Sequence, residues 1–410
     1  MADGAKRQSQ VDGERVRELT ARHVMQTYRR LPLVLVRGEG SWVWDDQGRR
    51  YLDFVSGIAV TAAGHVHPEI TAAICRQAQT LGHVSNLYHT APQAELAARL
   101  ARLSGLQRVF FCNSGAEANE AALKLARRWA WLKAGGSGAQ GPAPYVVLTA
   151  VRSFHGRTYG ALTLTGQEKY QEGFAPLVPG VVHVPLNDVA ALEAAFTPEV
   201  AAVLLEPVQG EGGVYPCTQE YLQAARRLCD RHGALLIFDE VQTGLGRTGR
   251  TFAFQHYGVV PDALTLAKAL GGGLPLGALL AREEVAAAFV PGAHASTFGG
   301  NPVCCAAGLA FLDLLEREDL PGRAARLGRR LVEGLLDLGR RNPKVGEVRG
   351  LGLMLGVDVG EEAAEVAAAC RENGLLLNAV APHTLRLLPP LSVTEDELDL
   401  ALAILAKALA

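Results

Sequence analysis

The chain has 410 residues, enough for two or three domains of ordinary size. Its formal net charge is −2 with acids and bases interspersed, so the charge pattern does not predict binding to nucleic acid or to an anionic membrane. No apolar run approaches the roughly 18 residues of a membrane helix. The seven cysteines lack CxxC spacing, which favours a reducing, cytoplasmic environment.

The N-terminal part predicts an extension followed by antiparallel strands. Residues 1–22 are polar and lack the apolar core of a signal peptide, so we expect a frayed, flexible extension. The segments 33–37 and 41–44 flank a glycine-containing turn and predict a hairpin, and a second turn leads into a strand at 50–54. The segment 68–81 predicts a helix.

From about residue 95 the pattern changes to buried strands that alternate with helices. Glycine and proline are frequent in 134–144, which predicts a surface loop. Strands alternating with helices favour a mostly parallel sheet that is covered on both faces. The predicted helices are 95–103, 114–133 and 219–232, and the predicted strands are 108–112, 145–148, 201–205, 234–238 and 263–266.

The C-terminal part predicts a smaller α+β unit. After Asn301-Pro302 we expect helices up to Glu316 and over 323–338, strands within 348–357 and 385–388, and a last helix over 395–409. The chain is therefore predicted to be α/β, with one large central domain and a small α+β domain built from both termini. The expected boundaries are 1–22 for the extension, 81–307 for the large domain, and 23–80 with 308–410 for the small one.

A lysine and an acid follow two of the apolar runs. Lys268 lies between the run 263–266 and a glycine cluster, and Asp239 ends the run 234–238. An amine in apolar surroundings loses stability as a cation, so its pKa falls and it becomes a usable nucleophile. A carboxylate nearby could hold a protonated ring nitrogen, and this pair is what a pyridoxal phosphate (PLP) enzyme needs. Taken alone, a lysine before glycines is more often a surface residue.

A candidate anion site precedes the long helix. The segment Asn113-Ser-Gly-Ala-Glu-Ala-Asn119 follows a strand, and Ser114 and Glu117 have the spacing of a capping box. The free N–H groups of such a helix start, with Gly115 giving close access, can bind a phosphate. Taken alone, the segment is more often an ordinary capped helix, and a phosphate site is favoured only when other parts of a cofactor site accompany it.

Two further motifs do not predict sites. The GxGxxG match at 244–249 opens no obvious helix and lacks the acid that a dinucleotide-binding unit places about twenty residues later. His65 and His67 have no third ligand at a suitable spacing, so a turn with two imidazoles is favoured over a metal site. We therefore expect no metal.

Taken together, these segments resemble the class III (subgroup II) PLP-dependent aminotransferases. The resemblance extends from about Tyr28 to the C-terminus. It is carried by Asp239-Glu-Val-Gln-Thr-Gly-Leu-Gly-Arg-Thr-Gly249, Pro261-Asp262, Lys268 with its glycines, and Ser296-Thr-Phe-Gly-Gly-Asn-Pro302. It implies the fold type I architecture and PLP as cofactor.

The family pattern implies roles in cofactor binding. Lys268 matches the Schiff-base lysine, Asp239 the acid at the ring nitrogen, and Gln242 the residue near the phenolic oxygen. Ser114, Gly115 and Ala116 match the phosphate-binding segment, and Phe154 matches the aromatic residue that stacks on the ring. Thr297 matches a residue that reaches the phosphate of the neighbouring subunit, which implies a homodimer with shared active sites.

The resemblance also implies a substrate site. Arg157 matches the arginine for the substrate α-carboxylate, Arg386 the arginine that receives 2-oxoglutarate, and Glu211 the acid that pairs with Arg386. A carboxylate that neutralises Arg386 and then swings away would let one pocket accept two different substrates, because an unpaired buried charge is costly. A purely structural Arg386–Glu211 pair is the alternative. The pattern also places Tyr28, Ile58 and Ser296 at this site.

Within the family, three features point to the branch that acts on N2-acetylornithine. They are Ile58, where ornithine aminotransferases usually have tyrosine, the segment Ser85-Asn-Leu-Tyr-His-Thr90, and Phe154-His-Gly-Arg157. The implied reaction gives N-acetylglutamate 5-semialdehyde and glutamate, as in arginine biosynthesis. Carrier-bound lysine or ornithine and succinyldiaminopimelate remain open as donors, and free ornithine or 4-aminobutyrate fits less well.

Two other classes share parts of this pattern. An aminomutase or racemase would keep Lys268 and Asp239 but needs no external keto acid, so Arg386 with Glu211 favours transamination. A non-catalytic PLP-binding regulator usually carries an added DNA-binding module, and no such module fits before Tyr28.

Overall fold

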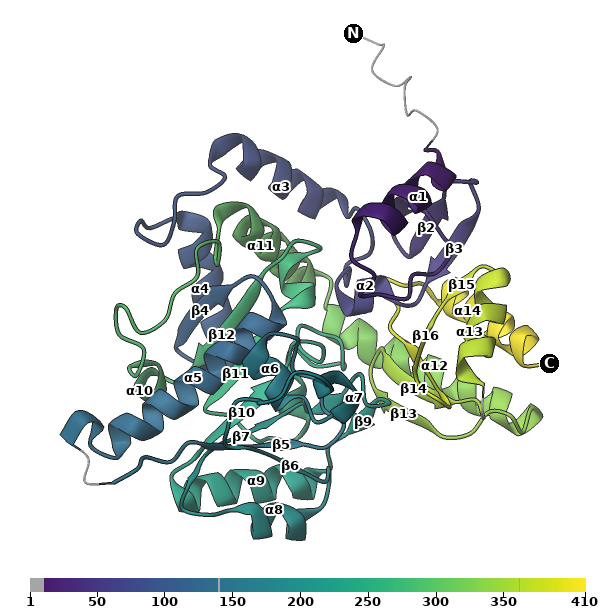
Figure 1. Cartoon of the computed structure of the whole chain (residues 1–410). Coiled ribbons are helices and arrows are strands. Elements are labelled where there is room, and N and C mark those ends of the chain that lie inside the picture. Colours follow the sequence, from purple (N-terminus) through teal and green to yellow (C-terminus); the bar gives the residue numbers. More distant parts are fainter. Residues whose placement is uncertain (1–10, 139–140, 361) are drawn as a thin grey trace.

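The computed structural model describes residues 11–138, 141–360 and 362–410. Its centre is a twisted sheet flanked by helices, and smaller sheets lie beside it (Figure 1). Within the described residues the central strand order is β4-β12-β11-β10-β7-β5-β6. Their bounds are β4 Arg108–Cys112, β5 Val146–Ala150, β6 Val181–Val184, β7 Val200–Leu205, β10 Leu235–Asp239, β11 Ala263–Leu266 and β12 Gly277–Ala281. Only β12 runs antiparallel to its neighbours, which confirms the mostly parallel sheet.

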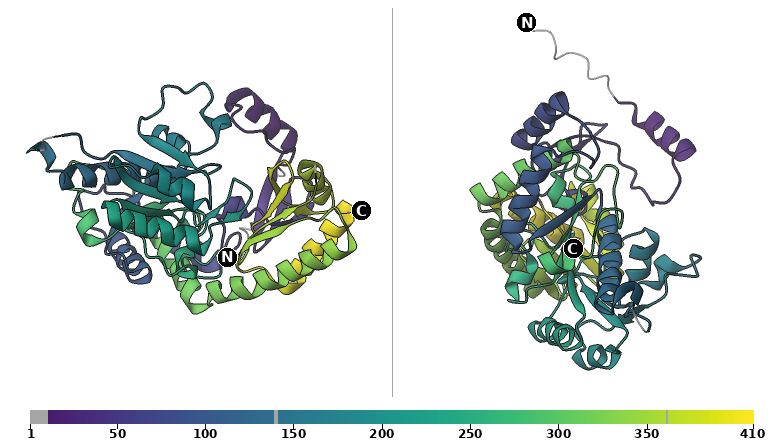
Figure 2. Two further views of the ribbon diagram at one scale, coloured as in Figure 1. Left: turned by 90° about the horizontal axis from the view of Figure 1, so that it is seen from below. Right: turned by 90° about the vertical axis from the view of Figure 1, so that its left-hand side faces the viewer.

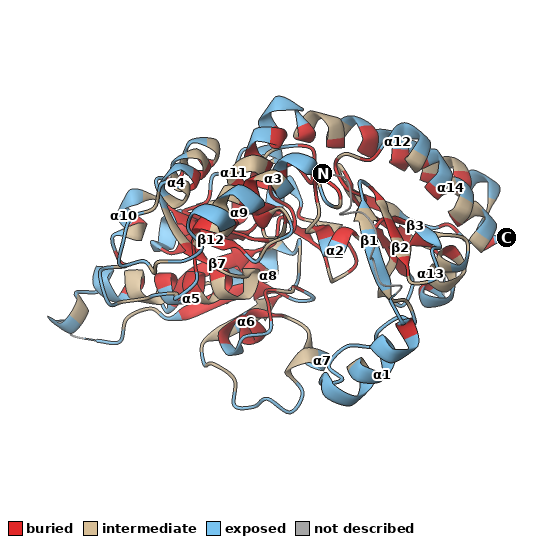
Figure 3. Cartoon of the chain, turned by 90° about the horizontal axis from the view of Figure 1, so that it is seen from above, coloured by how far each residue is buried: buried red, intermediate tan, exposed pale blue. Residues whose placement is uncertain are grey.

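Helices cover both faces of this sheet because its strands are apolar on both sides. In β10, Leu235 and Ile237 pack in the cluster that contains α5, whereas Leu236 and Phe238 pack in the cluster that contains α9. Successive strand residues point to opposite faces, so a continuous apolar run needs a cover on each. Figure 3 shows the buried residues concentrated in these strands and the exposed ones on the outer helices.

The helices that precede, cover or follow the central sheet match most of the predicted ones within a few residues. The prediction of 219–232 is confirmed to the residue, and that of 323–338 is short of the observed helix by three residues at each end. The observed helices of this part are α3 Pro68–Thr80, α4 Ala91–Ser104, α5 Gly115–Lys133, α6 Tyr159–Leu164, α7 Glu168–Gln171, α8 Val189–Ala195, α9 Gln219–His232, α10 Glu283–Ala286, α11 Pro302–Arg317 and α12 Leu320–Arg341. Short 3-10 turns are η1 Gly136–Gly138, η2 Ala253–His256 and η3 Lys268–Gly271.

The two ends of the chain lie together on one side of the central sheet (Figure 2). The first sheet joins β1 Leu35–Glu39, β2 Trp42–Asp45 and β3 Arg50–Asp53 to β15 Leu375–Leu376, which comes from the C-terminal part. The C-terminal sheet has the order β13-β14-β17-β16, with bounds Val348–Leu351, Met354–Asp358, Thr384–Leu387 and Asn378–Ala381. Helices α13 Ala363–Glu372 and α14 Glu395–Leu409 complete this part, with α2 Ser56–Ala59 and the hairpin β8 Val208–Gln209 and β9 Tyr215–Pro216.

Three sequence expectations differ from the structure. Gly13–His23 forms helix α1, capped by the Asp12 carboxylate, so a frayed extension is wrong for residues 13–22; residues 1–10 lie outside the described residues. The segment 348–357 is a hairpin of two strands because Gly352 takes a positive φ at its turn. Strands β6 and β12 of the central sheet were not predicted. The expected loop 134–144 includes residues 139 and 140, which also lie outside the described residues.

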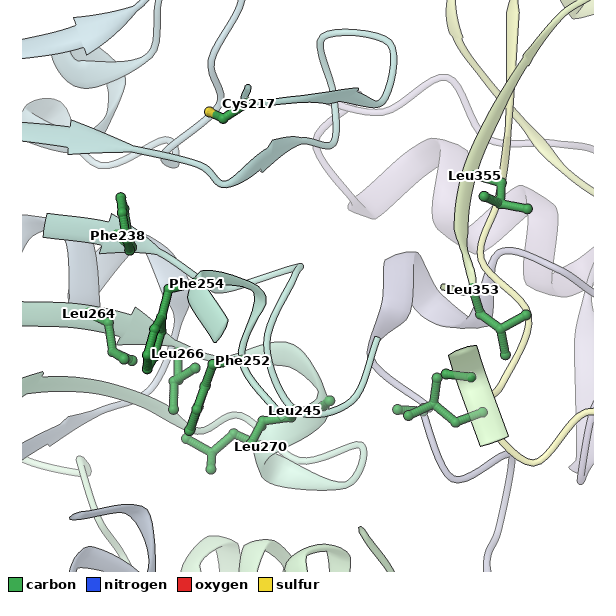
Figure 4. Packing of buried hydrophobic residues seen from close by; sticks show 14 of the residues in the cluster. Cys217, Phe238, Leu245, Phe252, Phe254, Leu264, Leu266, Leu270, Leu353 and Leu355 are labelled. Carbon is green, nitrogen blue, oxygen red and sulfur yellow. The ribbon is translucent and has the colours of Figure 1, made fainter. Parts of the chain in front are cut away.

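Buried aromatic side chains pack at the end of the central sheet that faces the C-terminal sheet. Phe252 and Phe254 stack with 5.7 Å between ring centroids, and Leu266 and Leu270 lie beside them (Figure 4). Leu353, in the turn between β13 and β14 of the C-terminal sheet, belongs to the same cluster. Arg247, in the GxGxxG segment, donates to the carbonyls of Leu353 and Pro389 at 3.0 and 2.5 Å. The segment therefore packs the two sheets together.

Candidate active site

A cavity of about 530 Å³ lies at the carboxyl ends of the central strands. Asp239 is the last residue of β10 and is paired in register with Thr265 of the adjacent parallel strand β11. Lys268 follows β11 by two residues, so strand order alone brings the acid and the lysine to the same edge. Both residues line the cavity. In open α/β sheets, ligands bind at this edge, outside the carboxyl ends of the strands.

Asp239 is buried, and several donors hold its carboxylate. Asn119 Nδ2 and His155 Nδ1 each lie 2.7 Å from Asp239 Oδ2, and the amide of Val241 donates to Oδ1 at 3.0 Å. Thr265 in turn donates to Asn119 Oδ1 at 2.8 Å, which fixes the amide orientation. These hydrogen bonds hold the carboxylate in one orientation.

Lys268 presents a buried amine to the cavity. Burial lowers the pKa of its ammonium to about 8, with Glu211, Asp239 and Glu206 opposing this effect. Its backbone takes φ +48, a left-handed conformation that side-chain-bearing residues seldom adopt and that functional sites often contain. The direction of this shift is the one expected from the sequence.

The lowered pKa predicts how the amine reacts with an aldehyde such as PLP, the cofactor that the resemblance implies. Only the neutral amine can attack an aldehyde, and its fraction rises about tenfold per pH unit below the pKa. Uptake followed by absorption should therefore accelerate with pH up to about 8 and level off above it. A profile that keeps rising to pH 10 would mean an ordinary lysine pKa. Uptake by the exposed-lysine variant Lys133→Ala should follow the wild-type profile.

The start of α5 forms an anion-binding cradle. The Ser114 hydroxyl accepts from the Glu117 amide at 3.2 Å, and the Glu117 carboxylate accepts from the Asn113 amide at 2.6 Å. The remaining first-turn N–H groups of a helix have no intrahelical partner, and Gly115 and Ala116 line the cavity. A Cβ at Gly115 would lie 2.7 Å from Val241 Cγ1, so a larger residue would displace Val241 from the cavity wall.

Flat apolar surfaces line the middle of the cavity. Phe154 and Val241 both contribute to its wall. Phe154 is held by the edge of Tyr170 at 5.9 Å, and the Arg157 guanidinium lies over the Tyr170 ring at 3.8 Å. Arg157 therefore reaches the cavity with its charge supported by an aromatic face.

A second arginine, Arg386, lies behind Glu211 and Gln242, which line the cavity. Arg386, on β17, is only 1% exposed and donates to Glu211 at 2.5 Å and to Gln242 Oε1 at 3.3 Å. Burial alone would raise the pKa of Glu211, but Arg386 and Lys268 hold it below its usual range. Glu211 is therefore ionised and neutralises Arg386. The Nε atom of Arg386 is buried without a partner among the described residues, so the guanidinium has donor capacity to spare.

The structure brings most of the predicted residues to this cavity, but not all. Tyr28 is 72% exposed and Ile58 40% exposed, and neither lines it. Thr297 lines a separate hollow, and Ser296 approaches the cavity only through a 3.3 Å hydrogen bond from Asn113 Nδ2. Arg386 does not line the cavity either, although its partner Glu211 does. The roles of all the predicted site residues stay predictions.

Sequence reasoning missed several residues of the site. Asn119 and His155, which hold Asp239, and Val241, on the wall, stand within the quoted motifs but were given no cofactor role. Glu206, which accepts from the Phe154 amide at 3.0 Å, was also missed; burial raises its pKa. His155 carried the clearest signal, since it directly follows the predicted stacking residue.

The two motifs that predicted no site have structural roles. His65 Nε2 lies 2.8 Å from Asp53 Oδ2, and the GxGxxG segment packs against the C-terminal sheet. Over residues 11–138, 141–360 and 362–410, no three His, Cys, Asp or Glu side chains are grouped as metal ligands. In the same residues no helix combines the length and apolar character needed to cross a membrane.

Comparisons with known proteins agree with this geometry. The sequence matches the family Aminotransferase class-III over residues 24–409. It is 52% identical over 385 residues to the acetylornithine aminotransferase of Caldanaerobacter subterraneus subsp. tengcongensis, covering 94% of this chain and 96% of the relative. It is 53% identical to that of Gloeobacter violaceus, covering 95% and 96%.

Solved structures show the same fold. The ornithine aminotransferase of Toxoplasma gondii ME49 superposes with a TM-score of 0.92 at 37% identity, covering 97% of this chain and 95% of that one. The acetylornithine aminotransferase of Elizabethkingia anophelis superposes with a TM-score of 0.86 at 37% identity, covering 97% and 98%. With the lysine, acid and phosphate cradle in one cavity, the chain belongs to the class III aminotransferase family.

Proposed function

We propose that this enzyme uses PLP to transfer the δ-amino group of N2-acetyl-L-ornithine to 2-oxoglutarate, giving N-acetyl-L-glutamate 5-semialdehyde and L-glutamate. The observation that carries the proposal is one cavity lined by Lys268, Asp239 and Glu211, in which Glu211 neutralises Arg386 directly behind it. Relatives about 50% identical over nearly the whole chain are named acetylornithine aminotransferases, which supports the choice of donor.

The residues present fit PLP. The amides of Gly115 and Ala116 would hold its phosphate, Phe154 and Val241 would cover its two ring faces, and Asp239 would hold its ring nitrogen. The fit is chemical as well as spatial: a carboxylate held by Asn119 and His155 suits a cationic ring nitrogen. A relative from Toxoplasma gondii is described with partial occupancy of PLP at its active site.

The chain's own residues then divide the work of the reaction. When bound, PLP supplies an electron-withdrawing ring that stabilises negative charge on the substrate carbon next to the nitrogen. Lys268 Nζ would hold the cofactor and, once released, would remove and return the proton at that carbon as general base and acid. Its lowered pKa suits this role near neutral pH. Asp239 would keep the ring nitrogen charged.

Arg386 and Glu211 let one cavity serve two substrates. With the donor bound, Glu211 stays on Arg386 and cancels its charge next to a neutral part of the substrate. With 2-oxoglutarate, the second carboxylate takes the guanidinium fork in place of Glu211. Arg157, at the other end of the cavity, binds the carboxylate that both substrates share. This arrangement favours transamination over an aminomutase or racemase reaction, which needs no keto acid.

We further propose a homodimer with shared active sites, working in the cytoplasm. Leu87, Tyr88 and Phe298 are 84%, 67% and 60% exposed and adjoin the hollow that contains Thr297. Such a group of large apolar side chains supports contact with a second copy, which would bring Thr297 to its partner's phosphate cradle.

The seven cysteines are free, which suits a reducing compartment. The division at residues 23, 81 and 308 into two domains stays part of this proposal.

Steady-state kinetics with alternative amino donors test the substrate. With 2-oxoglutarate as acceptor, N2-acetylornithine should give the highest kcat/KM among acetylornithine, succinyldiaminopimelate, carrier-bound lysine, ornithine and 4-aminobutyrate. A tenfold preference for any other donor would replace the proposed one.

Replacing Glu211 with glutamine should change the two half-reactions differently. Loss of the charge leaves Arg386 uncompensated when the donor is bound, so donor kcat/KM should fall about tenfold. The acceptor must displace Glu211 anyway, so 2-oxoglutarate kcat/KM should be unchanged or higher. Single-turnover measurements of each half-reaction check this, with the exposed Glu220→Gln as control. Equal losses in both half-reactions would make the pair merely structural.

A further inference from the structure

A turn that carries Glu211 is gripped by two arginines from one face of the C-terminal sheet. The turn is residues 210–214, between β8 and β9. Arg386 on β17 binds Glu211, and Arg349 on β13 donates through Nε to the carbonyl of Gly213 at 2.8 Å. The Arg349 guanidinium also lies over the Tyr215 ring at 4.2 Å, just beyond the turn.

The strand register explains why both arginines reach the same turn. Arg349 is paired with Gly356 of β14, and Gly356 is paired with Arg386 of β17, in antiparallel ladders. Residues directly opposite in antiparallel strands point to the same face of the sheet. The two guanidinium groups therefore flank a position that has no side chain.

The turn packs directly against Gly356, the glycine between the two arginines, which we call the seat of the turn. A Cβ at Gly356 would lie 2.9 Å from Val214 Cβ and 3.2 Å from the Gly213 carbonyl oxygen. The turn itself is tightly specified, since Gly213 has φ +115 and Val214 φ +58. The turn thus rests directly on the β14 backbone and has little freedom to move sideways.

The two arginines differ in how completely they are bonded. Arg349 also donates to both oxygens of Asp358 at 2.8 and 2.9 Å and to Thr384 Oγ1 at 2.9 Å, so its donors are engaged by protein groups. Arg386 holds Glu211 through one nitrogen and has its Nε atom unpartnered within the described residues. Arg349 is therefore a fixed anchor, whereas Arg386 can exchange Glu211 for another carboxylate.

We propose that Arg349 is a positioning residue for substrate exchange: it anchors the turn at Gly213, with Gly356 as its seat, so that Glu211 returns to Arg386 whenever no second carboxylate is bound. The inference rests on the proposed function, because it gives Arg386 the task of receiving a dicarboxylate. It implies that weakening the anchor weakens the hold of Glu211 on Arg386 and so favours dicarboxylates.

Glutarate, a dicarboxylate without an amine or keto group, is the probe. Calorimetry on the holoenzyme should show that the Kd for glutarate falls about fivefold in Arg349→Lys, which keeps a charge for Asp358 but loses the Nε donor to the Gly213 carbonyl. Gly356→Ala, which pushes the turn from its seat, should have the same effect, and Glu347→Gln, which removes only an exposed partner of Arg349, should have none. Faster hydrogen exchange over 210–216 in Arg349→Lys would show the loosened turn independently of substrate.

A double variant separates positioning from general loosening. In Glu211→Gln, glutarate should already bind more tightly, and adding Arg349→Lys should change the Kd less than twofold, because the anchor acts through Glu211. An additive change, or glutarate binding that is weakened or unchanged by Arg349→Lys, would overturn the inference. Absence of acetylornithine turnover in the wild-type enzyme would instead overturn the proposed donor, and the glutarate and exchange measurements would still decide the role of Arg349.

Discussion

Lys268→Ala is expected to lower kcat by about 10⁴-fold or more, because one side chain supplies both the covalent attachment and the proton transfer. The amine is buried at the carboxyl ends of β10 and β11, and burial lowers its pKa to about 8. Within the cavity lining it is the amine positioned for these roles. Single-turnover decay of the cofactor absorbance after addition of N2-acetylornithine measures the effect.

The control for this variant is a lysine outside the cavity. Lys133 lies exposed at the end of α5, and its alanine variant should retain wild-type rates. Addition of a small primary amine should partly restore proton transfer in Lys268→Ala, because the cavity left by the side chain can admit it. A loss of less than tenfold would show that another group acts as the base.

Asp239→Asn should lower kcat by about 10²–10³-fold while leaving the fold intact. The amide has nearly the same shape as the carboxylate but carries no charge to keep the ring nitrogen protonated. In addition, the new side-chain NH2 group would face the Nδ2 group of Asn119, which lies 2.7 Å from Asp239 Oδ2, so that two donors meet without an acceptor. Both effects act on the cofactor ring and not on substrate binding, so KM for the donor should change little.

The pH dependence of the cofactor spectrum gives an independent measurement for this variant. In the wild-type holoenzyme the ring nitrogen should keep its proton over the stable pH range, whereas in Asp239→Asn it should lose it as pH rises. His155→Leu, which removes only one donor to Asp239, should give a smaller loss of kcat, on the order of tenfold. Equal losses in Asp239→Asn and His155→Leu would contradict the central role of the charge.

The sequence predicted the central layers well because their signals are local. Continuous apolar runs such as 234–238 can only be strands covered on both faces, and the periodicity of 219–232 and 395–409 gave helices α9 and α14 to the residue. Strand β12 was missed because its segment, Gly277–Ala281, follows a glycine cluster that predicts only turns. Strand β12 lies antiparallel between β4 and β11, and its pairing with β4 joins segments that are more than 150 residues apart in the sequence.

The site was predictable where one residue has one chemical role, and less so where a role depends on contacts. Lys268, Asp239 and the start of α5 follow from motif and strand order. The support that Asn119 and His155 give Asp239 depends on packing between α5, β10 and the loop after β5, which a single sequence does not reveal. The row formed by Arg349, Gly356 and Arg386 depends on sheet register, and residues 348–357 alone predicted one strand where there are two. Helix α1 was missed because its polar composition resembles that of an extension.

The most direct test of the account is borohydride reduction of the holoenzyme, followed by digestion and mass spectrometry. A cofactor held by the buried amine will be fixed to the peptide that contains Lys268, and the label will disappear in Lys268→Ala. A holoenzyme whose cofactor stays unattached, or is attached to a different lysine, would contradict the assignment on which every role described for this cavity depends.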